Sequence, residues 1–293
     1  MAGRLQHLLS ILDLEKIDHN LFRGQSGNSR WQRVFGGHVI AQALVAAHRS
    51  VAPDRFIHSL HAYFIRPGDP DRPIIYEVEP LRDGRSFSVR RVVAKQNGVA
   101  ILSFSSSFQV DEPGLDYQRP MPADLPEPET LTGEDKINQA IVESAPENIR
   151  DYWNQQRPFI IRPIDLQEYL KREKHLPVQR CWFKLNGKVD SDRCLNSALL
   201  AYLSDMTLLD TSLLVHGLSI FTPGLIPASL DHSMWFHRSF SLDDWMLYDI
   251  ESPNTNGARG LSEGFIYTRN GKLIASVAQE GLIRLAKQTS SAK

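Results

Sequence analysis

The sequence predicts an α+β fold that is built twice along the chain. In each half, a helix rich in small residues is associated with antiparallel strands joined by tight turns, which is an α+β arrangement. The strong hairpin signal Asn97-Gly98 recurs 173 residues later as Asn270-Gly271. Phe64-Ile-Arg66 likewise precedes Phe236-His-Arg238 by 172 residues. Because two marks recur at nearly the same offset, we interpret the chain as a duplicated domain.

A proline-rich segment separates the two halves. Five prolines fall within the sixteen residues from Pro113 to Pro128, mixed with acidic groups, which is typical of an extended surface linker. We therefore expect an N-terminal domain over 1–112 and a linker over 113–157, whose polar end (133–156) is partly helical. A C-terminal domain over 158–293 follows. A chain of 293 residues is long enough for two domains of about 130–150 residues each.

In the first half, helical spacing of leucines predicts an amphipathic helix over residues 4–16. Gly36-Gly37 opens a second helix that ends near His48. Its many alanines and valines allow it to lie close against a flat sheet. Strands are predicted over 20–24, 57–66, 74–81, 86–96 and 99–110.

The second half repeats this order with a helix over 193–209, again rich in small and apolar residues. Pro253 is expected to end a strand, because proline cannot donate a hydrogen bond to a neighbouring strand. Strands are predicted over 158–162, 178–185, 229–238, 245–252, 257–268 and 273–284.

Composition excludes several functions and suggests a compartment. A net charge of −1 argues against an electrostatic binder of nucleic acid, which normally carries a basic excess. Cys181 and Cys194 are too few for a disulfide framework and match no metal-ligand spacing. A reducing interior is the default for such a chain, and we expect a cytoplasmic protein.

Targeting and membrane signals are not expected either. Asp13 and Glu15 directly follow the short apolar run at the N-terminus. This run is therefore predicted to be an amphipathic helix and not a signal peptide. Apolar runs fall short of the ~18 residues of a membrane span, so stable membrane association is not expected. The final residues, SSAK, differ from the Ser-Lys-Leu peroxisomal signal.

The stretch Ser229–Arg238 carries more groups that can exchange protons than a structural strand usually does. Asp231, His232 and His237 suggest a Ser–His–Asp triad with Ser229. Alternation along one strand, however, sends neighbouring side chains to opposite faces. The serine also lacks a Gly-x-Ser-x-Gly elbow. We therefore reject a triad and interpret Asp231 as an ion-pair partner of Arg238.

Asp205 lies in a nearly apolar part of the second-half helix. On a helical wheel Asp205 is flanked by Tyr202, Leu208 and Leu209. A position on the solvent-exposed face of the helix is therefore the less favoured interpretation for Asp205. A carboxylate among apolar groups must find hydrogen-bonding partners, or its pKa rises. The first-half helix, residues 36–49, contains no Asp or Glu. The N-terminal half is therefore expected to copy the layout without the chemistry.

Other polar residues are ambiguous from the sequence alone. Ser229 can be a reactive hydroxyl or a serine that bonds to backbone at the start of a strand. Gln279 can hold a water molecule or a carbonyl oxygen, but an edge-strand glutamine is the favoured interpretation. His58 and His61 could act as bases, yet the nearby helix offers them no carboxylate, which favours packing or ligand contact.

Several motifs, spread over nearly the whole chain, form one pattern. They are Leu14–Ile17, Leu21–Ser26, Val34–Gly37, Tyr63–Asp69, Leu81–Gly84, Ser86–Ser88, Asp231–Arg238, Ala258–Gly260 and Gln279–Gly281. This pattern resembles the acyl-CoA thioesterase II family, whose fold is the double hotdog. The resemblance implies that each half is a long helix wrapped by a curved antiparallel sheet. It also implies that the halves pair as a pseudo-dimer with a continuous sheet.

The resemblance also implies the site and the reaction. The family uses an Asp, a Thr or Ser and a Gln, which match Asp205, Ser229 and Gln279. These residues are expected to hold the water that hydrolyses an acyl-CoA thioester, with Asp205 as general base and without an acyl-enzyme. A backbone N–H near a helix start is expected to stabilise the thioester oxygen. Ser229 keeps the hydroxyl of the more usual threonine but has a less fixed rotamer.

The same resemblance sets the expected partners. The substrate is acyl-CoA, CoA is part of it, and no separate cofactor or metal is expected. The helix–sheet interface would supply an apolar tunnel for the acyl chain, whose preferred length the sequence does not give. A homodimer or homotetramer is implied. The candidates for holding the CoA phosphates are Arg66, Arg90, Arg91, Arg238 and Arg259.

Two alternatives compete with this interpretation. A hotdog enoyl-thioester hydratase would need a paired His and carboxylate, but the adjacent His232 and Asp231 point apart. A non-catalytic acyl-CoA binding protein would have no need for Asp205, Ser229 and Gln279. Release of free CoA would distinguish an enzyme from a binder.

Overall fold

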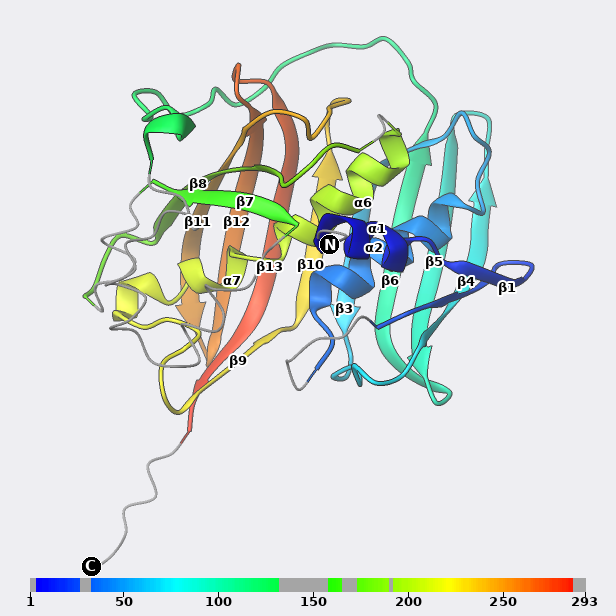
Figure 1. The fold of residues 1–293 in the computed structure, drawn as a ribbon, viewed down its shortest axis with the longest axis horizontal. Helices are drawn as coiled ribbons and strands as arrows, with labels where there is room; N and C mark the ends of the chain where they lie inside the picture. The colour runs from blue at the N-terminus through cyan, green and yellow to red at the C-terminus, as the bar shows by residue number, and fades with distance from the viewer. Residues whose placement is uncertain (1–3, 27–32, 132–157, 165–172, 190–191, 287–293) are drawn as a thin grey trace, which may run out of the picture.

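One curved antiparallel sheet wraps around two central helices (Figure 1). The structure is a computed structural model that describes residues 4–26, 33–131, 158–164, 173–189 and 192–286. Within these residues, thirteen strands form the sheet, in the order β1-β2-β4-β5-β6-β3-β10-β13-β12-β11-β8-β7, and β9 adds to β13. The first six strands in this order belong to the N-terminal half and the others to the C-terminal half.

The N-terminal half follows the predicted order and adds one short strand, β1. Its first helix ends at Leu12, earlier than expected, because the chain turns there into β1. The elements are α1 (Arg4–Leu12), β1 (Glu15–Asp18), β2 (Leu21–Gly24), α2 (Gly36–His48), β3 (Phe56–Phe64), β4 (Ile74–Asp83), β5 (Phe87–Gln96) and β6 (Val99–Gln109).

The C-terminal half repeats this design, with the short elements α7, η3 and β9 between its helix and the rest of its sheet. The elements after β6 are η1 (Pro128–Thr130), β7 (Phe159–Pro163), β8 (Val178–Leu185), α6 (Arg193–Ser204), α7 (Leu208–Thr211), η3 (Leu214–His216), β9 (Leu225–Ser229), β10 (Asp231–Phe236), β11 (Met246–Asn256), β12 (Arg259–Thr268) and β13 (Leu273–Leu285).

The two halves join through β3 and β10, which pair antiparallel at the centre of the sheet. In this pairing His61 lies opposite Ser233. These two residues are 172 apart, which is the offset between the repeated Phe64-Ile-Arg66 and Phe236-His-Arg238 motifs. Corresponding residues therefore face each other where the halves meet. This is the continuous sheet of a double hotdog that the resemblance implied.

The helices α2 and α6 pack together inside the sheet. Gly37 allows the close approach, since a side chain there would collide with the carbonyl oxygen of Tyr202 on α6. The Tyr202 ring packs edge-on against Phe35, with ring centroids 5.0 Å apart. The small residues of α2 are almost all buried, as expected for a helix enclosed by a sheet.

The prediction of one helix over 193–209 was wrong. Helix α6 ends at Ser204, with Asp205 as its C-cap, and α7 begins only at Leu208. Thr207, at φ −129° and ψ −5°, separates the two helices. Apolar periodicity continues through the break, which is why the sequence pattern did not reveal it.

The prediction of one unbroken strand over 229–238 was also wrong. Ser229 pairs with Gly281, whereas Ser233 pairs with Ala278, so the register shifts by one residue around Leu230. Such a bulge re-aims side chains. Ser229 and His232 are three residues apart, yet both consequently lie on the face of the sheet that carries Gln279.

The prediction that a strand ends at Pro253 was wrong, because a second bulge accommodates this proline. Strand β11 continues through this proline to Asn256. Its pairing with β12 shifts between Glu251 and Asn254. A proline is tolerated at a bulge because the regular hydrogen-bond ladder is already interrupted there.

The described part of the linker, residues 113–131, runs along the C-terminal half. The Gln118 side chain donates to the carbonyl of Gly271 and accepts from the N–H of Leu273. The indole N–H of Trp182 donates to the carbonyl of Pro126 over 3.0 Å. A second apolar cluster packs beneath this segment. Residues 133–156, predicted to be partly helical, lie outside the described residues, and the domain boundaries stay a prediction.

One segment is apolar enough by length and composition to cross a membrane, contrary to the expectation from the sequence. It is Arg193–His216, with a mean hydropathy of 1.4 in its most apolar window. In the structure it is divided into α6, α7 and η3, and 67% of that window is buried inside the protein. This pattern is that of a core helix.

Candidate active site

Asp205 connects the two halves of the chain. From the C-terminal end of α6, its Oδ2 accepts the backbone N–H of Gly37, in the first turn of α2, over 2.7 Å. Gly36 lies so close that a β-carbon on it would stand 2.7 Å from the same oxygen. The N-terminal half, which was expected to copy the layout without the chemistry, therefore supplies a hydrogen-bond donor to the candidate site. The Gly-Gly pair permits both the close helix packing and the approach of the carboxylate.

Burial raises the pKa of Asp205 from its ordinary value of 3.8 to about 7. The hydrogen bonds from Gly37, Gln279 and Ser229 favour the ionised form and oppose this rise in the pKa. The positive end of α2 also favours the ionised form. A carboxylate with a pKa near 7 is well matched to general base chemistry at neutral pH.

Ser229, at the end of β9, lies between the other two predicted residues. Its hydroxyl donates to Asp205 Oδ1 over a long 3.4 Å. Its oxygen accepts a hydrogen bond from Gln279 Nε2 over 2.9 Å. The bulge around Leu230 directs Ser229 to the inner face, which a regular strand running on to His232 would not do.

Gln279 lies in the middle of β13 and is only 1% exposed. The favoured interpretation from the sequence, a glutamine on an edge strand, was wrong, since β10 and β12 flank β13. The structure thus brings together Asp205, Ser229 and Gln279 from three elements that are distant in the sequence.

His232 is a neighbour that sequence reasoning did not assign to this site. Its Nδ1 lies 2.6 Å from Gln279 Oε1, and its Nε2 lies 2.9 Å from Ser204 Oγ. His232 and Ser204 are both fully buried. The available signal was its alternation with Asp231 and Ser233, which places His232 on the inward face of the strand.

Comparison with known proteins identifies the family. The acyl-CoA thioesterase family profile matches residues 150–282, and the profile for the N-terminal domain of acyl-CoA thioesterases matches residues 27–109. Acyl-CoA thioesterase 2 of Haemophilus influenzae is 42% identical over 98% of this chain and 100% of its own length. This chain belongs to the acyl-CoA thioesterase family. It is an acyl-CoA thioester hydrolase.

Solved structures agree with this family and its fold. The acyl-CoA thioesterase II TesB2 of Mycobacterium marinum is 37% identical, with a TM-score of 0.78 over 98% of this chain and 99% of that one. A protein of unknown function with a hot dog fold from Alicyclobacillus acidocaldarius is only 17% identical. Its TM-score is 0.76 over 95% of this chain and 98% of its own. The double hotdog fold of the thioesterase is thereby confirmed.

The remaining histidine candidates of this thioesterase have other partners. The ring of His58 lies 2.8 Å from Ser107 Oγ and packs edge-on against Phe87. The exposed His61 lies 3.1 Å from Ser233 Oγ, in the central pairing of the two halves. Neither contact involves a carboxylate, and packing or ligand contact stays the predicted role of both histidines.

The ion pair predicted between Asp231 and Arg238 was wrong. Asp231 accepts the backbone N–H of Glu280 over 2.8 Å, and burial raises the pKa of its carboxyl. Arg238 instead pairs with Asp116 of the linker, because it follows the end of β10 at the side where the linker passes. Asp231 and His232 do not converge, which removes the arrangement that a hydratase would need.

The arginine candidates for the CoA phosphates differ in accessibility. Arg90 is 2% exposed, and its guanidinium is occupied by Asp83 and Ser50, so it is a structural residue. Arg66, Arg91 and Arg259 lie at the surface, where Arg259 pairs with Glu280.

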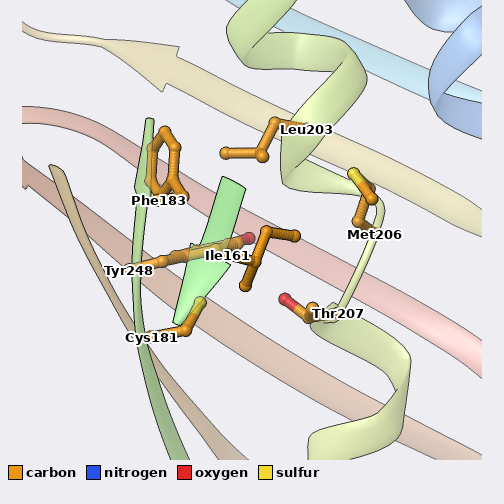
Figure 2. A pocket seen from close by; sticks show the side chains of 7 residues that line it. All are labelled: Ile161, Cys181, Phe183, Leu203, Met206, Thr207 and Tyr248. Atoms are coloured by element: carbon orange, nitrogen blue, oxygen red, sulfur yellow. The ribbon is translucent and has the colours of Figure 1, made fainter. Parts of the chain in front are cut away.

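A narrow apolar cavity lies beside the C-terminal end of α6 (Figure 2). Its walls stand too close together to admit a water molecule. The hydroxyl of Tyr248 on its wall donates to the carbonyl of Ser204, the residue before Asp205, over 3.0 Å. The side chains that line it come from α6, β7, β8, β11 and the turn after α6: Ile161, Cys181, Phe183, Leu203, Met206, Thr207 and Tyr248.

In the parts of the chain that the structure describes, no group of three or more His, Cys, Asp or Glu side chains could hold a metal ion.

Proposed function

We propose that the thioesterase hydrolyses fatty acyl-CoA by direct attack of a water molecule held by Asp205, Ser229 and Gln279. Asp205 acts as the general base, and the serine hydroxyl and glutamine amide orient the water and its target. The observation that carries this proposal is the convergence of the three side chains, at 2.9 and 3.4 Å from one another through Ser229. A carboxylate with a pKa near 7 at this point supports the role of base.

The proposed reaction proceeds without a covalent bond between the acyl group and the enzyme. As the water oxygen bonds to the thioester carbonyl carbon, one of its protons passes to the Asp205 carboxylate. The tetrahedral intermediate then collapses, the carbon–sulfur bond breaks, and the thiolate of CoA takes up the proton from Asp205. The products are a fatty acid and free CoA, and the carboxylate is restored for the next turnover.

Negative charge develops on the thioester oxygen during this attack. We place this oxygen near the first turn of α2, where the positive end of the helix dipole favours an anion. The N–H of Gly37 is held by Asp205, and those of His38 and Val39 bond to the carbonyl of Phe35, so the proposed donor is the N–H of Gly36. Preorganised donors of this kind stabilise a transition state more than the ground state.

The acyl chain is proposed to enter the apolar region beside Asp205, where the cavity of Figure 2 begins. The cavity is closed to water, so a long chain would have to displace side chains. Met206, next to Asp205, is suited to this because its unbranched side chain adapts to irregular spaces.

Other features of the proposal rest on the sequence and the family. The described chemistry requires no cofactor beyond the CoA of the substrate. Surface arginines are proposed to hold the phosphates of CoA, with Arg90 excluded by its burial. A cytoplasmic homodimer or homotetramer is proposed, without stable attachment to a membrane.

A single-turnover experiment with excess enzyme tests the direct attack. The reaction is run in water enriched in ¹⁸O and quenched in acid, and both the intact protein and the released fatty acid are weighed by mass spectrometry. We expect ¹⁸O in the fatty acid and unchanged protein mass. An acyl group on Ser229, or ¹⁸O that enters Asp205 in place of the product, would overturn the proposal.

A further inference from the structure

We infer that His232 is a positioning residue that fixes the orientation of the Gln279 side-chain amide. This inference deepens the proposed function and rests on it, because it explains how one member of the site is held. His232 lies behind Gln279 as seen from Asp205 and Ser229, and it touches neither of these two residues in a hydrogen bond that the structure describes.

The amide of Gln279 has two ends with opposite requirements. Its Nε2 donates to Ser229 Oγ over 2.9 Å and also hydrogen-bonds the Asp205 carboxylate. Its Oε1 lies 2.6 Å from His232 Nδ1. If the amide rotated by half a turn, its oxygen would face the carboxylate and lose both donor contacts. The enzyme therefore needs a donor that holds Oε1 on the far side.

His232 meets this need when its proton is on Nδ1. The Nδ1–H then donates to Gln279 Oε1, and the lone pair of Nε2 accepts the hydroxyl proton of Ser204 over 2.9 Å. Ser204 Oγ also lies 2.9 Å from the carbonyl of Ala201, so its single proton has a choice of acceptors. The Nδ1–H tautomer directs this proton to His232.

Burial supports the neutral form of this histidine. His232 is 0% exposed, and burial lowers its pKa to about 4. At neutral pH it therefore carries a single ring proton, and it does not compete with Asp205 for the role of base. A neutral donor can orient Gln279 without adding a charge next to the carboxylate.

Two substitutions separate the contacts of His232. In His232→Asn, the amide can reach the position of Nδ1 and keep a donor for Gln279. In His232→Gln, the longer amide reaches toward Nε2 and Ser204 but leaves Gln279 Oε1 without its partner. The exposed His237, whose ring lies 2.8 Å from Ser276 Oγ, supplies the control His237→Gln.

The test measures kcat and KM for CoA release with Gln279 intact and with Gln279→Ala. With Gln279 intact, we expect His232→Gln to lower kcat by about 10- to 100-fold, with substantial rescue in His232→Asn. In the Gln279→Ala background, His232→Gln should change kcat by less than about twofold, because the amide that His232 orients is gone.

The outcomes distinguish this inference from the proposed function. Equal losses of kcat in both backgrounds, or a harmless His232→Gln beside a damaging Gln279→Ala, would overturn the inference alone. A harmless Gln279→Ala would overturn the proposed site and the inference with it. Nitrogen-15 NMR of the wild-type enzyme determines which ring nitrogen of His232 carries the proton, and this result does not depend on how variants fold. We expect the Nδ1–H tautomer of His232, and an Nε2–H tautomer would overturn the inference.

Discussion

The carboxylate of Asp205 accepts the backbone N–H of Gly37 over 2.7 Å, although the two residues are 168 positions apart and belong to different halves of the chain. Neither half therefore holds the candidate site alone. The C-terminal half supplies Asp205, Ser229 and Gln279, and the N-terminal half supplies the helix end that holds the carboxylate. This relationship gives a physical reason for the two halves to be joined in one rigid sheet.

The first prediction concerns the space that this contact needs. A β-carbon at Gly36 would stand 2.7 Å from Asp205 Oδ2 and 2.8 Å from the Phe64 ring. We expect Gly36→Ala to displace the carboxylate and lower kcat by about 10-fold or more, measured as CoA release. Gly114→Ala is a suitable control, because a side chain there would meet nothing within 4 Å. Full activity of Gly36→Ala would contradict the role given to the Gly-Gly pair.

The second prediction concerns stability and follows from the pKa of Asp205. Below about pH 4 the carboxyl is protonated in both the folded and the unfolded state. As the pH rises, the unfolded chain ionises first, since burial holds the folded pKa near 7, and the folded state loses stability until about pH 7. Asp205→Asn does not titrate. Its free energy of unfolding should exceed that of the wild type by about 1 to 3 kcal/mol at pH 8.

Urea unfolding of both proteins near pH 4 and at pH 8 checks this prediction. The advantage of Asp205→Asn should shrink or vanish at the lower pH. A constant difference between the two proteins across this range would mean that the pKa of Asp205 is not raised by folding.

The third prediction concerns the hydroxyl of Ser229. Ser229→Ala removes both the donor to Asp205 and the acceptor for Gln279, so we expect kcat to fall by about 10- to 100-fold. Ser229→Thr keeps the hydroxyl and stiffens its rotamer, and should stay within about threefold of the wild type. If alanine and threonine behaved alike in CoA release, the hydroxyl would have no part in the reaction.

The fourth prediction concerns the length of the acyl chain. Cys181 lines the cavity on β8 and is 3% exposed. A larger side chain in Cys181→Phe should oppose the displacement of side chains that a long acyl chain requires. It should therefore lower kcat/KM for long-chain acyl-CoA by about 10-fold, while a short-chain substrate serves as the internal control. An equal loss on all chain lengths would indicate damage to the fold, and no loss on any would exclude this cavity as the acyl site.

Local sequence chemistry predicted much of the fold. The Asn97-Gly98 turn formed as expected, with both residues at positive φ, because few other residues adopt that conformation. Strand-forming residues between turn signals and the small residues of α2 predicted most of the longer elements. The break at Asp205 and the bulge around Leu230 were missed, because contacts with distant parts of the chain determine both.

Less of the candidate site than of the fold could be predicted from the residues alone. Asp205 stood out from the residues alone, as a carboxylate among apolar neighbours. Ser229 and Gln279 were assigned only through the family resemblance, and the catalytic roles of all three stay a prediction. Gly37 and His232 were missed because a backbone N–H carries no sequence signal, and a buried histidine becomes meaningful only when its partners are known.

The central claim is that Asp205 is the base that activates water. The most direct test measures kcat/KM for CoA release from short-, medium- and long-chain acyl-CoA against pH, for the wild type and Asp205→Asn. We expect wild-type kcat/KM to rise with pH through a midpoint near 7, as the carboxylate ionises. Asp205→Asn should be slower by about 10²-fold or more and should lack this rise. Equal activity of the two proteins, with the same dependence on pH, would contradict the account.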